Sequence, residues 1–137
     1  MKFRECLEKV IEPSLRSELN NELLSLRGPH EETILHYLCV ENYVDSVHWL
    51  LQKGVDCNTV NSFGNTPLMD AIALDHEEIV ALLLRMGADP NFQNEYGDTA
   101  LHKAYECKSS EAIKNLLVGH GASEDLKNDL DLTPAES

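Results

Sequence analysis

The chain has 137 residues, of which 42% are hydrophobic and 6% aromatic. This length fits one domain, and the apolar content suffices for a packed core of mainly aliphatic side chains. No run of 18 apolar residues occurs, which excludes a membrane-spanning helix, and the charged N-terminus lacks the apolar stretch of a secretory signal. We therefore expect a cytoplasmic protein whose four cysteines, at positions 6, 39, 57 and 107, are reduced thiols.

Negative charge dominates the composition, with 24 acidic residues against 11 basic ones and a net charge of −13. Residues 1–27 are neutral overall, so the whole excess lies in residues 28–137. Such a surface repels phosphate backbones and anionic lipid, which predicts no nucleic-acid partner and no membrane binding. It favours a basic protein partner. The alternative is that the charge serves solubility alone.

Residues 1–27 begin with apolar positions at helical spacing, Leu7, Val10 and Ile11, and Pro13 then ends this first helix. A second helix is predicted after Ser14, because apolar residues recur at i, i+4, i+8 and i+11. These are Leu15, Leu19, Leu23 and Leu26. We interpret residues 1–27 as an N-terminal helical cap over the segment that follows. The alternative is an amphipathic helix that binds a partner.

The remaining sequence repeats with a period of about 33 residues. Four threonines, at positions 33, 66, 99 and 133, are 33, 33 and 34 residues apart, and three glycines, at 54, 87 and 121, keep the same interval. The predicted units are therefore 28–60, 61–93 and 94–127, with a partial unit at 128–137.

Each unit reads as a helix, a short turn, a longer helix and a loop. In the second unit Thr66 is suited to cap a helix that begins at Pro67, and Asp75-His76 interrupts the apolar pattern. The apolar run Ile79–Leu84 forms the second helix, which Gly87 ends in the left-handed conformation. Repetition of this unit predicts an all-α solenoid of stacked helix pairs, each covered by its neighbours.

Over residues 28–137 the chain resembles the ankyrin repeat family. The resemblance rests on the period, on Gly64–Leu68 (GNTPL), on Gly87–Asn91 (GADPN) and on Thr99–His102 (TALH). The sequence departs from the family at Glu31 and Asp131, which replace a turn glycine. At Glu31 we expect an altered hairpin tip.

Histidines occupy the family's Thr-x-Leu-His position in two units, as His36 and His102, whereas Met69 stands there in the second unit. The resemblance implies that these imidazoles bond within and between repeats. Asp56 and Asp89 lie in Gly-x-Asp-x-Asn loops, where a short carboxylate can accept bonds from nearby backbone amides.

Signals of catalysis are missing from the sequence. There is no glycine-rich phosphate loop, no His-Glu-x-x-His motif and no calcium-loop spacing. Lys103 lies one helical turn before Cys107 and is expected to lower its pKa slightly, but no base accompanies the thiol. We therefore predict no catalytic residue, no cofactor and no metal site.

The family resemblance implies a concave binding surface made of hairpin tips and the exposed side of each first helix. When the family's binding positions are carried over to this sequence, the resemblance predicts aromatic side chains surrounded by acidic ones. The predicted partner-binding residues are Glu32, Glu41, Phe63, Asn65, Asp70, Leu74, Glu95, Tyr96, Asp98 and Glu106. Phe63 and Tyr96 occupy equivalent tips and would lie side by side, or would pack against neighbouring hairpins instead. The acids would form a rim, or only a solvated face.

We interpret the chain as a non-catalytic protein–protein interaction module, monomeric alone and able to enter a hetero-complex with a basic protein. It also resembles short bacterial ankyrin proteins that act as immunity partners, which implies an inhibitor that occludes a toxin enzyme. A further alternative is a host or viral adaptor that recruits a partner without inhibiting it.

Overall fold

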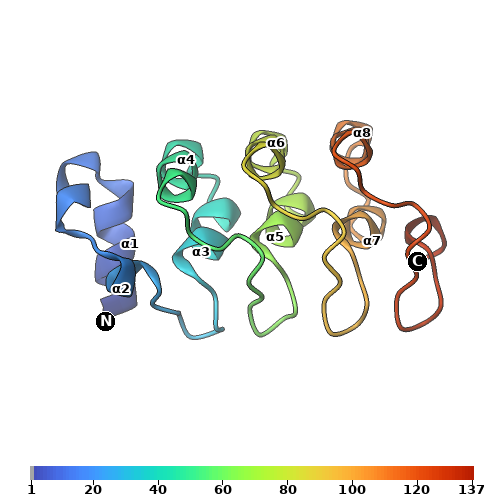
Figure 1. Cartoon of the computed structure of the whole chain (residues 1–137), viewed down its shortest axis with the longest axis horizontal. Coiled ribbons are helices and arrows are strands. Elements are labelled where there is room, and N and C mark those ends of the chain that lie inside the picture. The colour runs from blue at the N-terminus through green and yellow to red at the C-terminus, as the bar shows by residue number, and fades with distance from the viewer. Residues whose placement is uncertain (1) are drawn as a thin grey trace.

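The computed structural model describes residues 2–137, which form a row of stacked helix pairs with the two termini at opposite ends (Figure 1). The inner helices are α3 (Ile34–Val40), α5 (Pro67–Ala73) and α7 (Ala100–Glu106), and the outer helices are α4 (Val44–Gln52), α6 (Glu77–Arg85) and α8 (Glu111–Gly119). Long hairpin loops project below the inner helices (Figure 1). Apart from one isolated bridge between Arg27 and Thr33, the described residues contain no β-structure. The predicted all-α solenoid is therefore confirmed.

The N-terminal segment covers the first helix pair. Helix α1 (Lys2–Ile11) packs against α3 and α4 and buries Cys6, Leu7 and Val10 in the common core. Its apolar face is therefore used inside the fold, which favours the interpretation as a cap over that as a free partner-binding helix.

The prediction of one long second helix in this segment is wrong. The chain instead forms a 3₁₀ helix, η1 (Pro13–Glu18), and then a separate short helix, α2 (Asn21–Leu24). Asn20 causes the break, because its backbone is extended and its Oδ1 accepts a hydrogen bond from the N–H of Leu23 at 2.9 Å. Asparagine bonds nearby backbone more readily as a cap than inside a helix.

Three inner helices begin at a threonine cap, as the sequence predicts. The hydroxyl of Thr33 accepts from the N–H of His36, that of Thr66 from Met69, and Thr99 caps α7 in the same way. Pro67 occupies the first turn of α5, where a missing N–H costs nothing. The last element, η2 (Pro134–Glu136), follows Thr133 in the corresponding position.

The turns between inner and outer helices are left-handed at one residue each. Asn42, Asp75 and Lys108 have φ angles of 61°, 58° and 53°. The predicted interruption at Asp75 is confirmed, since α5 ends at Ala73 and α6 begins at Glu77. The tight turn lays the outer helix back against its inner partner.

The core is one continuous apolar cluster running through the stack. Inner helices pack side by side in the order α3, α5, α7, η2, and outer helices in the order α4, α6, α8. The largest fully buried side chains are aliphatic, with representatives in every pair, such as Leu38, Ile72, Leu83, Leu101 and Leu117. Each fully buried side chain of this size contributes about 1.5–3 kcal/mol, so the pairs depend on their neighbours for stability.

Candidate functional site

The hairpin tips are held by an asparagine that the sequence analysis did not single out. In the second unit Asn61 Oδ1 accepts hydrogen bonds from the N–H groups of Phe63 and Asn65, at 3.0 and 3.1 Å. Asn94 and Asn128 make the same two bonds in the next hairpins. These asparagines keep the 33-residue and 34-residue intervals, so the period could have revealed them. This pair of hydrogen bonds to one asparagine side chain, here called the asparagine bracket, gives each tip a defined shape in the absence of a partner.

The first hairpin reaches the same shape with a different side chain. Gly28 stands where the asparagine would be, and the Glu32 carboxylate accepts from the N–H of His30 at 2.7 Å. That carboxylate fills the space that a Cβ atom on Gly28 would need. Glu31 adopts a φ of 58°, in the region where Gly64 has 75°. The alteration expected at Glu31 is therefore confined to side-chain bonding, and the backbone turn is unchanged.

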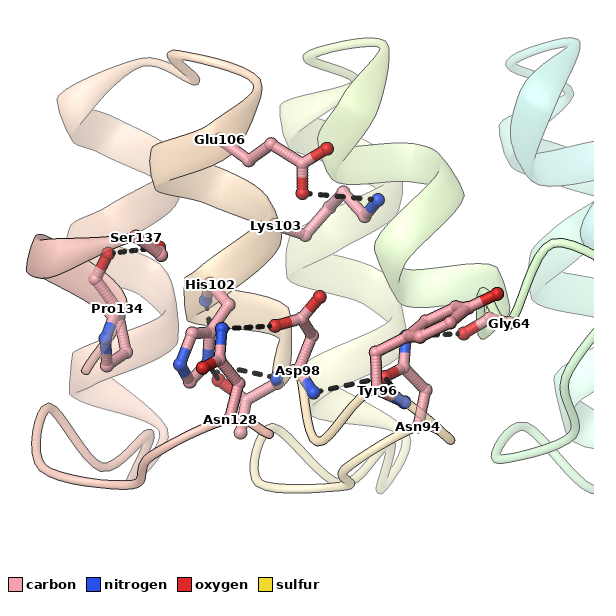
Figure 2. Close-up of polar contacts among 11 residues, drawn as sticks. Gly64, Asn94, Tyr96, Asp98, His102, Lys103, Glu106, Asn128, Pro134 and Ser137 are labelled. Atoms are coloured by element: carbon pink, nitrogen blue, oxygen red, sulfur yellow. Dashed lines mark hydrogen bonds and ion pairs between the residues drawn. The ribbon is translucent and has the colours of Figure 1, made fainter. Parts of the chain in front are cut away.

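Neighbouring hairpins are bonded into a continuous row. The N–H of Ser62 donates to the carbonyl of His30 at 2.8 Å, and the N–H of Asp129 donates to that of Tyr96 at 2.9 Å. Between these two junctions, Asn94 Nδ2 donates to the carbonyl of Gly64 at 2.8 Å (Figure 2). The tips are consequently fixed relative to one another as well as internally.

Large apolar side chains stand at equivalent positions on three successive tips. Phe63 is 60% exposed, Tyr96 56% and Leu130 76%. Phe63 leans toward the preceding hairpin, with its ring centroid 5.3 Å from that of His30. Tyr96 lies over Gly64, where an added Cβ would come within 3.3 Å of Cε2 (Figure 2). Both aromatic residues thus pack on the neighbouring hairpin while most of each ring surface stays in solvent.

The ends of the inner helices add a second group of exposed residues. Leu74, which caps the C-terminus of α5, is 48% exposed, and Val40 at the end of α3 is 37% exposed. Glu41 and Glu106 are exposed beside them, although Glu106 lies 3.7 Å from Lys103 (Figure 2). The predicted combination of apolar and acidic side chains is therefore present at these helix ends.

Asp70 is less available than the sequence suggests. It is half-buried on α5 and accepts a hydrogen bond from Asn61 Nδ2 at 3.2 Å. Burial raises the pKa of Asp70 from 3.8 to about 6, against the opposing effects of a hydrogen bond from Asn65 and the charge of Lys103. The group is a partly desolvated structural carboxylate, and it offers a partner little negative surface.

Two further predicted acids are also engaged inside the fold. Glu32 accepts from the N–H of His30 in the first hairpin, and Asp98 Oδ1 accepts from Asn128 Nδ2 at 2.9 Å (Figure 2). The predicted set therefore divides into exposed and half-buried members. Exposed members are Glu41, Phe63, Leu74, Glu95, Tyr96 and Glu106, and half-buried members are Glu32, Asn65, Asp70 and Asp98.

The two inner-helix histidines are structural, as expected. His36 Nδ1 accepts from the Thr33 N–H at 3.1 Å, and its Nε2 lies 2.8 Å from the carbonyl oxygen of Asn65. This pattern requires the neutral tautomer with the proton on Nε2. Burial lowers the pKa of His36, which stabilises the same neutral form. His102 repeats the arrangement toward the carbonyl of Leu132, at 2.9 Å.

The structure also describes the surroundings of Cys107, Asp56 and Asp89. Burial is the larger effect on Cys107 and leaves the pKa of this thiol raised, although Lys103 lowers it as expected. Asp56 and Asp89 accept bonds from the N–H groups of Asn58 and Asn91, both at 2.9 Å, and are loop residues as predicted. Within residues 2–137 no three His, Cys, Asp or Glu side chains gather to hold a metal ion.

A cavity of about 330 Å³ lies between α2 and the first helix pair. Its walls include Leu24, Leu35 and Leu50, and its titratable groups are Arg27, Lys53 and Asp56. None of the predicted partner-binding residues lines it.

Among the helices of residues 2–137, none has the length and apolar character needed to cross a membrane.

The stacked helix pairs and the hydrogen-bonded hairpins define a helical solenoid that presents a preformed surface. Comparison with family models matches residues 4–94 and 35–128 to ankyrin repeats in three copies. The chain belongs to the ankyrin repeat family, whose members generally mediate protein–protein interaction and are typically non-catalytic. A search of curated proteins found no match to the chain.

Proposed function

We propose that this ankyrin repeat protein binds a basic protein partner through the surface formed by its hairpin tips and inner-helix ends. The observation that carries the proposal is the row of exposed apolar residues on successive tips, at Phe63, Tyr96 and Leu130. Interfaces draw most of their energy from a few large side chains that become buried, aromatic ones above all.

Pre-formation of the tips supports the proposal energetically. The asparagine brackets and the bonds between hairpins hold Phe63 and Tyr96 in place before binding. A surface that is already ordered loses little conformational entropy on association. Burial of each ring would contribute about 1.5–3 kcal/mol, a large part of the affinity of a specific complex.

The charge of the surface favours a basic partner. Glu41, Glu95 and Glu106 are exposed among the apolar residues, and the chain carries a net charge of −13. Such a field raises the association rate of a positively charged protein and loses its effect as salt is added. Binding is therefore expected to weaken at high ionic strength.

Two biological roles fit this surface. In the first, the protein is an immunity-type inhibitor that occludes a cognate toxin enzyme in the cytoplasm, and its charge suits a basic, nucleic-acid-cleaving target. In the second, it is a host or viral adaptor that recruits a basic protein without changing its activity. Either role requires a hetero-complex and no turnover by this chain.

The test is affinity capture from source lysate with the wild-type chain and with the double variant Phe63→Ser, Tyr96→Ser. Both rings are more than half exposed, so the double variant should keep its fold. The matched control is Met86→Ser, Val118→Ser, which removes two exposed apolar residues, one at the C-cap of α6 and one in the last turn of α8. We expect one basic protein to be captured by the wild type and the control, and to be lost from the tip variant and at high salt.

Retention of full binding by the tip variant would overturn the proposed surface. If the captured protein is an enzyme, its activity is measured with an equimolar amount of this chain. Loss of activity supports the inhibitor role, and unchanged activity supports the adaptor.

A further inference from the structure

Every hairpin carries a ring or a large aliphatic side chain at the same tip position. The four residues are His30, Phe63, Tyr96 and Leu130, here called the tip row. All four are exposed, and the first two rings already touch. The tip row extends along the whole stack, because the hairpins succeed one another in the order of the helix pairs (Figure 1).

The interval between tips follows from the packing of the helices. Helices α3, α5 and α7 pack directly against one another, which places their axes about 8–10 Å apart. The first three hairpins enter α3, α5 and α7 through the same turn and the same threonine cap, and the fourth enters η2 at Thr133. Equivalent tip residues therefore recur at about the interval of the helices.

The backbone of the tips has no free N–H groups to offer at the bracketed positions. In the second hairpin the N–H groups of Phe63 and Asn65 both donate to Asn61. In the third hairpin those of Tyr96 and Asp98 both donate to Asn94. These four N–H groups are therefore not available to a partner that adds to the tips as a β-strand, which needs main-chain bonds. A segment whose backbone needs no hydrogen bond from these groups fits the tips better.

We propose that the tip row binds a basic, proline-rich segment in the polyproline II conformation, and this rests on the proposed function. Polyproline II has three residues per turn and rises about 3.1 Å per residue, so every third residue recurs after about 9.3 Å. This lies within the interval of about 8–10 Å expected between tips, and the heptad of an α-helix, at about 10.5 Å, lies just above that interval. The conformation has no internal hydrogen bonds and is preformed, which suits rigid aromatic contacts.

The side chains of the tip row match this segment. Rings of His30, Phe63 and Tyr96 offer flat apolar faces for pyrrolidine rings, which proline-rich segments use when they dock on aromatic surfaces. Exposed carboxylates of Glu31, Glu95 and Asp129 lie next to tip residues in the sequence, where they can pair with arginine at the intervening positions. A segment of about ten residues would reach all four tips.

The experiment uses the full chain and synthetic peptides labelled for fluorescence anisotropy. The probe is a twelve-residue peptide of four Pro-Arg-Ser units. The matched control peptide has the same composition, with the prolines at irregular intervals. We expect the regular peptide to bind about tenfold more tightly than the control. We expect the Phe63→Ser, Tyr96→Ser variant to bind the regular peptide about tenfold more weakly than the wild type does. The Met86→Ser, Val118→Ser variant should bind it with unchanged affinity.

Equal affinity for both peptides would overturn the inference, because charge alone would then explain binding. No measurable binding of the regular peptide would also overturn it, as would tighter binding of a basic helical peptide with leucine at every seventh residue. The proposed function fails separately, when the tip variant still captures its protein from lysate. The two proposals can also fail independently. If the tip variant no longer captures the protein but the two peptides bind with equal affinity, the proposed function is supported and only this inference is wrong.

Discussion

His36 Nε2 lies 2.8 Å from the carbonyl oxygen of Asn65, so an imidazole on one inner helix holds the hairpin of the next unit. The same side chain accepts a bond from its own helix cap through Nδ1. One residue therefore joins the start of α3 to the adjacent tip. His102 makes the corresponding connection, while Met69 interrupts the series in the middle unit.

His36→Ala is expected to destabilise the protein by about 1–3 kcal/mol. The substitution leaves the Asn65 carbonyl and the Thr33 N–H without their partner, and unpaired buried groups are costly. Urea unfolding monitored by circular dichroism measures the change. The control is His48→Ala, at an exposed position on α4. An equal loss in both variants would contradict the role given to His36.

Met69→His is expected to stabilise the protein by about 0.5–1.5 kcal/mol. Met69 is buried at the position where the other two units have histidine, and the imidazole would donate to the carbonyl of Asp98 in the next hairpin. Thermal unfolding provides the measurement. A lower midpoint than that of the wild type would show that the middle unit does not accommodate the ring.

Asp70→Asn is expected to stabilise the protein at pH 7, by up to about 3 kcal/mol. The folded pKa of Asp70 is about 6, above the ordinary 3.8, so the ionised form is disfavoured in the folded state. Between about pH 4 and pH 6 the folded chain holds a proton that the unfolded chain has released. This contribution to stability is present at low pH and is lost as the pH rises through 6.

His36 has the opposite pH dependence. Burial lowers its folded pKa below 6.5, so acidification protonates the unfolded chain first and destabilises the fold. The two effects offset each other in the wild type. In Asp70→Asn the effect of His36 is no longer opposed by that of Asp70, and the free energy of unfolding should decrease as the pH falls below about 6.5. Urea unfolding across this range tests both signs, with exposed Glu41→Gln as the control that keeps the wild-type profile.

Glu31→Gly is expected to stabilise the protein by about 0.5–1 kcal/mol. Glu31 has a φ of 58°, a left-handed conformation that costs an ordinary side chain about 1–2 kcal/mol, and glycine recovers most of this despite its greater unfolded-state entropy. Gly64→Ala is the converse variant and is expected to destabilise the protein. Alanine is strained at the φ of 75° that Gly64 adopts, and its methyl group would also crowd Tyr96. Thermal unfolding should move the midpoints in opposite directions. A shift of both in the same direction would show that the turn conformation does not decide stability.

Arg16→Lys is expected to destabilise the protein by about 1–2 kcal/mol. The guanidinium joins the N-terminal segment to the first unit, with Nε donating to the Val10 carbonyl at 2.7 Å and Nη2 to Asp45 at 3.2 Å. It also lies over the Trp49 ring, 5.0 Å from the centroid. Lysine cannot reproduce this planar set of contacts. Urea unfolding followed by Trp49 fluorescence measures the loss, and Arg4→Lys at an exposed position is the control.

Much of the fold could be predicted because its signals are local and repeated. The caps at Thr33, Thr66 and Thr99 and the interruption at Asp75 follow from residue types and short spacings. The break at Asn20 is not apparent from the sequence, because the leucine spacing around it also fits one continuous helix. The chain forms two separate elements because the N–H of Leu23 donates a hydrogen bond to Asn20 Oδ1, which caps α2.

The candidate surface was predictable in its position and less so in its chemistry. Phe63 and Tyr96 are exposed on the tips as their alignment suggests. Asp70 and Asp98 both belong to the positions that the family resemblance assigns to the binding surface, yet both accept hydrogen bonds from asparagines of the hairpins. A carboxylate that is bonded inside the fold cannot be told from a free one by its spacing.

The repeat, the helix caps and the tip residues are apparent from the sequence, since each depends on neighbours a few positions away and recurs every 33 or 34 residues. Which acids face solvent, why Asp70 has a raised pKa and how His36 joins two units are apparent only from the folded chain. These properties depend on burial and on bonds between residues about 30 positions apart. Such contacts exist only once the helix pairs have stacked.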